Sequence, residues 1–95
     1  MHSVFREVFG SSPVVRIIDF FLDNQEFAYS LADVIREEGI SFSTAKPVFS
    51  WLIASGVLVL HVKEGKACKY VLNRQHEFVK SLLALDAVLV EHVVV

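Results

Sequence analysis

The chain contains 95 residues, of which 54% are hydrophobic and 21% are charged, and its net charge is −2. This length corresponds to one domain, the composition excludes a disordered polar chain, and a single cysteine excludes a disulfide framework and a cysteine-based zinc site. Because so small a core cannot cover that many apolar side chains, we expect some of them to be buried in an oligomer.

The first predicted helix begins at Ser12 and Pro13. A serine caps helix starts well, and proline loses no hydrogen bond at the first helical position. Its apolar stripe has helical spacing and consists of Val14, Ile17, Ile18, Phe21 and Leu22. We expect Arg16, Asp19 and Asp23 to lie off this stripe. The polar residues 24–26 end the helix.

A second helix follows a short extended segment. Residues 27–29 are too few for a free strand but suit an edge strand. Ser30 then caps the second helix, and Asp33, three residues further on, is an acidic variant of the capping box. Gly39 suits the left-handed position after the helix end.

The third helix follows a tight turn and begins at Ser41. Its inward side chains are Ala45, Phe49, Leu52 and Ile53, and Gly56 ends it. Pro47 would remove a backbone hydrogen bond and kink a helix capped by Ser41. With Ser43 as the cap, the proline would instead fall in the first turn, where it costs less.

The next segment predicts a β-hairpin. Residues 57–63 are apolar and β-branched, a turn signal follows at Glu64 and Gly65, and residues 67–72 return as the second strand. We expect Lys63 and Lys66 at the tip of this hairpin.

A last helix is predicted from about residue 74 to residue 95, with Asn73 as its cap. Two apolar lines run along it: Phe78, Leu82, Leu85 and Leu89 form one, and Val79, Leu83, Ala87 and Val90 form the other. Such a helix has more apolar surface than its own domain can cover. Charged residues interrupt the run, whereas a membrane span needs about 20 residues with few or no charges. We therefore expect a soluble, cytoplasmic protein with no membrane partner.

Positive charge is confined to the middle of the chain. Residues 1–45 hold three basic and seven acidic side chains, for a net charge of −4. Residues 46–80 hold six basic and two acidic side chains (+4), and residues 81–95 hold two acidic ones (−2). This asymmetry can orient a protein on a polyanion although the total charge is slightly negative.

The segments carrying this pattern are FGSSPVVRIIDFFLDN, YSLADVIREEGISFSTAKPVFSWLIASGVLVL and GKACKYVLN. Together they resemble the winged helix-turn-helix DNA-binding domain of small archaeal and MarR- and ArsR-like regulators. The resemblance implies an α+β fold with a three-helix core, a two-stranded β-hairpin wing and a C-terminal dimerisation helix. A single domain would span 1–95, with the helix-turn-helix at about 30–55, the wing at about 57–72 and the C-terminal helix at about 74–95.

The resemblance further implies sequence- or shape-dependent binding of double-stranded DNA by a homodimeric transcriptional regulator. The expected DNA-binding residues are Phe42, Ser43, Thr44, Lys46, Pro47, Ser50, Lys63, Lys66 and Lys69. The expected dimer interface consists of Phe78, Leu82, Leu85 and Leu89. The third helix has no Arg, Asn or Gln for bidentate contacts to bases. We therefore expect DNA shape and contacts to the DNA backbone to contribute more to recognition than contacts to bases.

The main alternative is a winged-helix protein–protein interaction module without DNA binding. An exposed patch of Phe42, Val48 and Trp51 would favour it, although Trp51 is expected in the core or an interface. We find no catalytic constellation, and we expect neither enzyme activity nor a cofactor. A turn at residues 64–65 would place His61 opposite Cys68, but two ligands are too few for a stable metal site. Cys68 is expected to be a buried strand cysteine rather than a redox sensor.

Overall fold

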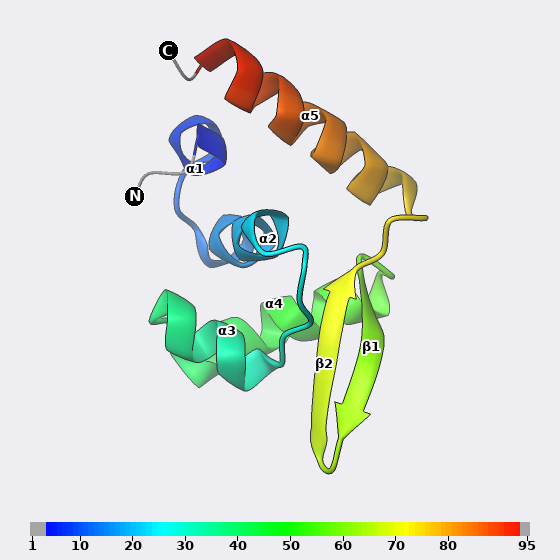
Figure 1. The fold of residues 1–95 in the computed structure, drawn as a ribbon. Coiled ribbons are helices and arrows are strands. Elements are labelled where there is room, and N and C mark those ends of the chain that lie inside the picture. Colours follow the sequence, from blue (N-terminus) through cyan, green and yellow to red (C-terminus); the bar gives the residue numbers. More distant parts are fainter. Residues whose placement is uncertain (1–3, 94–95) are drawn as a thin grey trace.

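A computed structural model describes residues 4–93, which form helices, a two-stranded antiparallel hairpin and a C-terminal helix (Figure 1). The elements are α1 (Val4–Phe9), α2 (Pro13–Asp23), α3 (Leu31–Glu38), α4 (Phe42–Ala54), β1 (Leu58–Glu64), β2 (Ala67–Leu72) and α5 (Glu77–Val93). The predicted α+β class is confirmed. The C-terminal helix was expected to reach residue 95, but residues 94 and 95 lie outside the described part. None of the described helices is long and apolar enough to cross a membrane.

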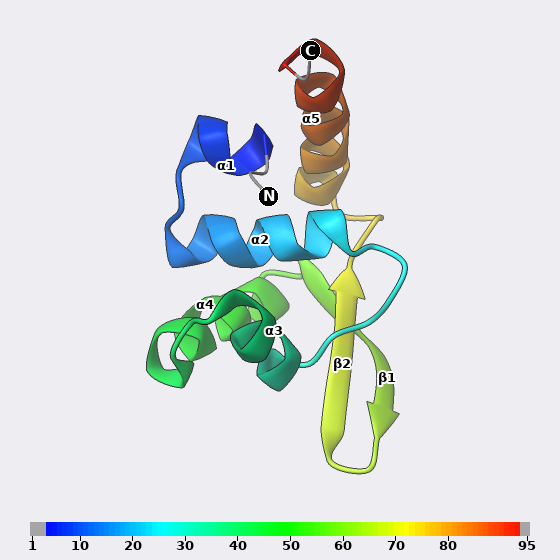
Figure 2. The same ribbon diagram turned by 60° about the vertical axis from the view of Figure 1, so that its left-hand side comes forward.

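Helix α2 lies at the centre of the fold. Figures 1 and 2 show α1 and α5 on one side of it and α3 and α4 on the other. Its buried residues are consecutive: Ile17, Ile18, Asp19, Phe20, Phe21 and Leu22. Ile17, Ile18, Phe21 and Leu22 were predicted in the apolar stripe, and they are buried. Val14, the fifth stripe residue, is exposed. The prediction for Asp19 was wrong, because a helix covered on both sides buries more than one stripe, and Asp19 is only 1% exposed.

The predicted caps at Ser12, Ser30 and Ser41 and the glycine after α3 are confirmed. The Ser12 side chain accepts a hydrogen bond at the start of α2, Ser30 and Asp33 form the complete capping box of α3, and Gly39 is left-handed with φ 64°. Ser41 caps α4, and its side chain accepts from the backbone of the third residue of the helix. Pro47 therefore lies inside α4 rather than in its first turn.

Helix α1, where no element was predicted, contributes the partly buried side chain of Arg6. Arg6 Nε donates to Asp19 Oδ2 at 2.6 Å, and Arg6 Nη2 donates to Glu38 Oε1 at 2.9 Å. Arg16 joins the same network, since its guanidinium lies 3.5 Å from the Glu38 carboxylate and also donates to the Glu38 carbonyl. This network links α1, α2 and α3, because Arg6 contacts both the buried Asp19 carboxylate on α2 and the partly buried Glu38 carboxylate on α3.

The hairpin register differs from the predicted one. The turn consists of Gly65 and Lys66, and Gly65 has a positive φ of 60°, as the first central residue of a type II′ turn requires. A bulge falls at His61, between the pairs on either side of it. Cys68 is therefore paired with Lys63, and the predicted pairing of His61 with Cys68 is wrong. Of residues 27–29, only Tyr29 bridges to the hairpin.

Helix α5 begins at Glu77, later than the predicted start near residue 74. The Asn73 side chain accepts from the Gln75 backbone and so forms a local turn instead of a helix cap. The His76 ring accepts from Phe78 N at 3.1 Å, and this residue takes the capping position.

We predict that Arg6→Met lowers the free energy of unfolding by about 3 kcal/mol, because it removes the cation beside a buried carboxylate. The measurement is urea denaturation. Arg36→Met serves as the control, since Arg36 pairs with Asp33 on the surface, and it should leave the midpoint almost unchanged. Adding Asp19→Leu to Arg6→Met should restore most of the loss. Equal effects of Arg6→Met and Arg36→Met would contradict this role of Arg6.

A second prediction concerns Asp86 on α5. Burial, followed by the nearby charge of Asp19, raises the pKa of Asp86 above its ordinary value of 3.8. The ionised form is thus disfavoured in the folded state, and this cost develops as the pH rises from 3.8 through the folded pKa. Asp86→Asn should therefore raise the Tm at pH 7 by roughly 1–2 °C, an effect reduced by solvent screening. The gain should vanish at about pH 3, where both states are protonated, and a gain equal at both pH values would exclude this cause.

Candidate nucleic-acid interface

An aromatic cluster holds the hairpin against α4. The ring of Phe49 packs edge-to-face on Tyr70, with centroids 5.4 Å apart, and lies 6.1 Å from Phe21 on α2. Tyr29 adds two backbone hydrogen bonds to Tyr70, at 3.0 and 2.8 Å. Side-chain packing and backbone pairing thus set where the hairpin lies relative to α4.

Helix α4 is divided into a buried side and an exposed side. Its buried residues are Ala45, Phe49 and Leu52, and α2 is the element that α4 contacts most. The opposite side carries small polar or neutral side chains and one cation: Ser43, Lys46, Pro47, Ser50 and Ala54. This face lacks acidic groups and bulky side chains at its centre, so another molecule can approach the helix closely.

A groove of about 310 Å³ lies between α4, the start of α3 and β2. Lys46 and Ser50 line it from α4, and Lys66 lines it from the tip of the hairpin. The structure thus brings three of the predicted DNA-binding residues to one concave surface. Lys46 and Lys66 are distant in the sequence. The packing of Phe49 on Tyr70 brings α4 and the hairpin together, so that both lysines line the same groove.

The bulge determines on which face of the hairpin Lys63 lies, although Lys63 is not among the residues that line the groove. Directly opposite residues of antiparallel strands share a face, so Lys63 lies on the same face as Cys68, which lines the groove. If side chains alternated strictly along β1, Lys63 would lie on the same face as Val59, opposite to Cys68. The extra residue at the bulge, His61, moves the Lys63 side chain to the Cys68 face instead. Lys69 lies on that other face by the same rule.

Among residues 4–93, no salt bridge joins Lys46, Lys63 or Lys66 to a carboxylate. Within residues 4–93, Lys80 is the only lysine in a salt bridge, at 3.4 Å from Glu77. The charge of Lys69 acts on Asp33. The pKa of Asp33 is lowered chiefly by a hydrogen bond from the Ser30 backbone, and the positive charge of Lys69 lowers it further by a smaller amount. Uncompensated positive charge therefore gathers on Lys46, Lys63 and Lys66.

The other predicted residues on α4 do not line the groove. Phe42 is 61% exposed at the start of the helix. The hydroxyl groups of Ser43 and Thr44 lie 3.3 and 2.9 Å from Ser41 Oγ, so they belong to the capping turn as well as to the surface. Pro47 has no backbone N–H, so α4 lacks one internal hydrogen bond at the Ser43 carbonyl.

The predicted dimer residues on α5 separate into two groups. Leu82 is buried, and Leu89 packs partly buried against the core of its own chain. Phe78 and Leu85 are 44% and 38% exposed. Val88, which is 49% exposed, belongs to neither of the two predicted apolar lines and was therefore missed.

Trp51 and Cys68 are both more exposed than expected. Trp51 is 59% exposed, so it is not in the core, contrary to one of its two expected places. Cys68 is only half-buried, and it lines the groove. In the described part of the chain, no group of three or more His, Cys, Asp and Glu side chains is arranged to hold a metal ion.

Comparison of the chain with protein-family models, curated proteins and solved structures gave no match. The chain's own residues therefore carry the functional inference.

Proposed function

We propose that this protein binds double-stranded DNA as a winged helix-turn-helix protein, with α4 as the recognition helix and the hairpin as the wing. The observation that carries the proposal is the groove lined by both Lys46 of α4 and Lys66 of the hairpin tip, neither of which has a carboxylate partner among residues 4–93. A helix of this kind fits the major groove, while a basic hairpin contacts the adjacent backbone. Order and placement of the elements are compatible with this assignment.

The residues on α4 favour backbone contact and shape readout over base readout. Its exposed side has serines and one lysine but none of the Arg, Asn or Gln side chains that read bases in pairs of hydrogen bonds. Ser43 and Ser50 can donate to phosphate oxygens, and the small side chains allow close approach. Sequence preference then comes mainly from DNA that adopts the required groove shape at low cost.

We further propose a homodimer formed through α5. Phe78, Ser81, Leu85 and Val88 follow the three- and four-residue steps of a coiled-coil seam, and three of these four are large apolar side chains left exposed. Pairing of two such helices would bury this row and place two copies of α4 on one DNA duplex. A cytoplasmic transcriptional regulator is the role that fits such a dimer.

Salt dependence tests the DNA contact. If Lys46, Lys63 and Lys66 each neutralise one phosphate in both protomers, log K falls with log salt at a slope of about −5. Lys46→Gln combined with Lys66→Gln should weaken binding at least about tenfold at low salt and reduce the slope by about 4. Fluorescence anisotropy with a labelled duplex measures both quantities.

The matched control is Lys80→Gln, which removes the same charge from an exposed lysine on α5 that already pairs with Glu77. It should leave the affinity and the slope nearly unchanged. No binding at low salt, or equal losses in the control and the groove variant, would refute the proposed interface.

The dimer is tested by a single charge on the α5 row. Leu85→Glu should give monomers in sedimentation or light-scattering measurements, because it places a charge in an apolar seam. Val90→Glu is the control: Val90 is similarly exposed but lies about 140° further round the helix. A dimer that survives Leu85→Glu, or is lost equally in Val90→Glu, would rule out this seam.

A protein-interaction module is the second candidate, favoured by the exposure of Phe42 and Trp51. These residues are nine positions apart, however, and so project about half a turn apart on α4, separated by about 13 Å along its axis. They do not form one patch. Lys63→Glu with Lys66→Glu separates the candidates, since it should abolish DNA binding but spare an apolar protein contact.

A further inference from the structure

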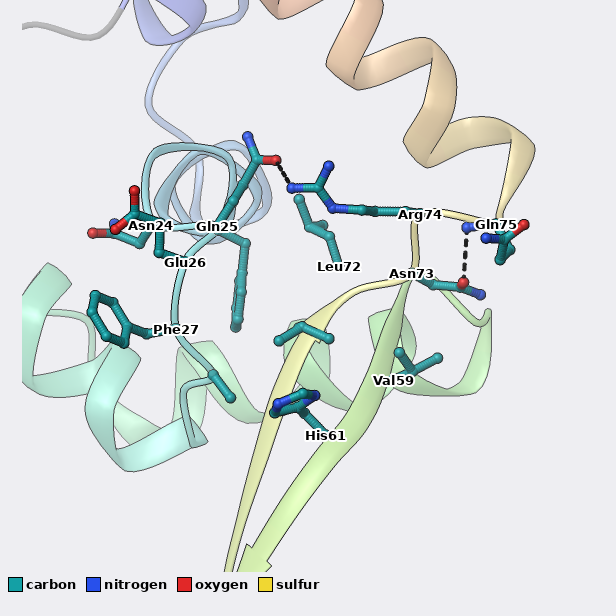
Figure 3. A pocket seen from close by; sticks show the side chains of 13 residues that line it. Asn24, Gln25, Glu26, Phe27, Val59, His61, Leu72, Asn73, Arg74 and Gln75 are labelled. Atoms are coloured by element: carbon teal, nitrogen blue, oxygen red, sulfur yellow. Dashed lines mark hydrogen bonds between the residues drawn. The ribbon is translucent and has the colours of Figure 1, made fainter.

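A second hollow, of about 290 Å³, lies on the other face of the hairpin (Figure 3). Val59 and Val71, which are directly paired in the sheet, form one wall. Tyr70 and Cys68, which line the lysine groove, alternate to the opposite face. The hairpin thus separates this pocket from the proposed DNA-binding groove.

The pocket has an apolar base and a polar rim. Phe21 and Leu72, both from the core, form the base together with the paired valines. The connection between α2 and α3 forms one side, and residues 73–75, which lead into α5, form the top. This volume lies at the lower end of the range for small-molecule sites, so the pocket suits a compact ligand.

Arg74 is the cation of this pocket, and it is already held in position. Its Nη2 donates to Gln25 Oε1 at 2.6 Å, and Figure 3 shows the guanidinium extending over Leu72 toward that amide. Arg6, Arg16 and Arg36 all pair with carboxylates. In the described part of the chain, Arg74 alone among the arginines has only a neutral partner.

Most other polar side chains of the rim already make hydrogen bonds within the chain. Asn24 donates to the Phe20 carbonyl, Gln25 to the Leu22 carbonyl and Asn73 to the Gly56 carbonyl. The remaining N–H groups of Arg74 can donate to a ligand, and so can the side chains of His61 and Gln75, which make no side-chain hydrogen bond within residues 4–93. These groups offer hydrogen-bond donors to an anionic ligand beside the Arg74 cation.

One acidic residue, Glu26, also lines the pocket. Figure 3 shows its carboxylate on the far side of the chain connection from Arg74, next to Asn24. No salt bridge joins it to Arg74 among the described residues. The charge of Arg74 is therefore not neutralised within the pocket.

We propose that this pocket binds a small organic carboxylate with a compact apolar body. The fork of Arg74 matches the two oxygens of a carboxylate, and the base formed by Phe21, Val59 and Val71 covers the apolar part. Gln25 keeps the guanidinium ordered in the empty pocket, which lowers the entropy lost on binding. The proposal does not depend on DNA binding and is tested on the free protein.

The probe is benzoate, titrated into the ¹⁵N-labelled protein and followed by NMR. Saturable shifts are expected at the backbone amides of residues 25–28, 59–61 and 73–75. Benzamide lacks the charge, and inorganic phosphate lacks the apolar body. Each should bind at least about tenfold more weakly than benzoate, the difference expected from one lost charge-assisted hydrogen bond or from an unfilled apolar base.

Two matched variants complete the test. Arg74→Gln should weaken benzoate binding at least about tenfold, and Arg74→Lys should recover part of the loss. Glu26→Gln, the corresponding neutralisation of the other charge in the pocket, should leave affinity unchanged or increase it. Unsaturable or scattered shifts, equal binding of benzamide, or insensitivity to Arg74→Gln would overturn the proposal. Circular dichroism of each variant confirms that a loss of binding is not a loss of fold.

Discussion

The position of Phe49 is the constraint on which the arrangement of this molecule depends. Its buried ring contacts α2 through Phe21 and the hairpin through Tyr70, while its backbone belongs to α4. Three elements from separate parts of the sequence therefore share one packing centre. Because Phe49 faces inward, the serines and Lys46 on the other side of α4 must face solvent. The same ring places the hairpin beside that exposed side, which brings Lys66 into the groove.

Charge is distributed unevenly over the fold for a physical reason. The carboxylates of Asp19 and Glu38 are satisfied by Arg6 and Arg16, so the arginines of the N-terminal helices are used inside the structure. The lysines of α4 and the hairpin find no such partners among the described residues. The result is a neutralised, partly buried network around α2 and a positive groove at the hairpin, within a chain whose total charge is negative.

The hairpin provides two different surfaces. The bulge at His61 places Lys63 on the same face as Cys68 and leaves Val59 on the opposite face, where it forms a wall of the Arg74 pocket. A bulge also disturbs the outer edge of β1, which discourages unwanted pairing with another strand. One irregular residue thus decides which face of the hairpin carries Lys63. A ligand in the Arg74 pocket would lie on the opposite face of the hairpin from the groove.

Most of the helices and the hairpin follow from local patterns in the sequence, although α1 does not. Caps at Ser12, Ser30 and Ser41 and the glycine after α3 follow from hydrogen bonding and backbone sterics within a few residues, and the hairpin follows from its β-branched runs. Local patterns could not show that α2 is covered on both sides, so the burial of Asp19 and its pairing with Arg6 were missed.

Tertiary structure also decided the register of the hairpin, because a single bulged residue reverses side-chain direction without leaving a clear mark in the sequence. It likewise decided which apolar residues of α5 remain exposed, since both lines have the same periodicity and only contact with the rest of the chain distinguishes them. Packing between distant segments brings Lys46 and Lys66 to one groove and pairs Gln25 with Arg74. Such contacts cannot be predicted from the conformational preferences of neighbouring residues.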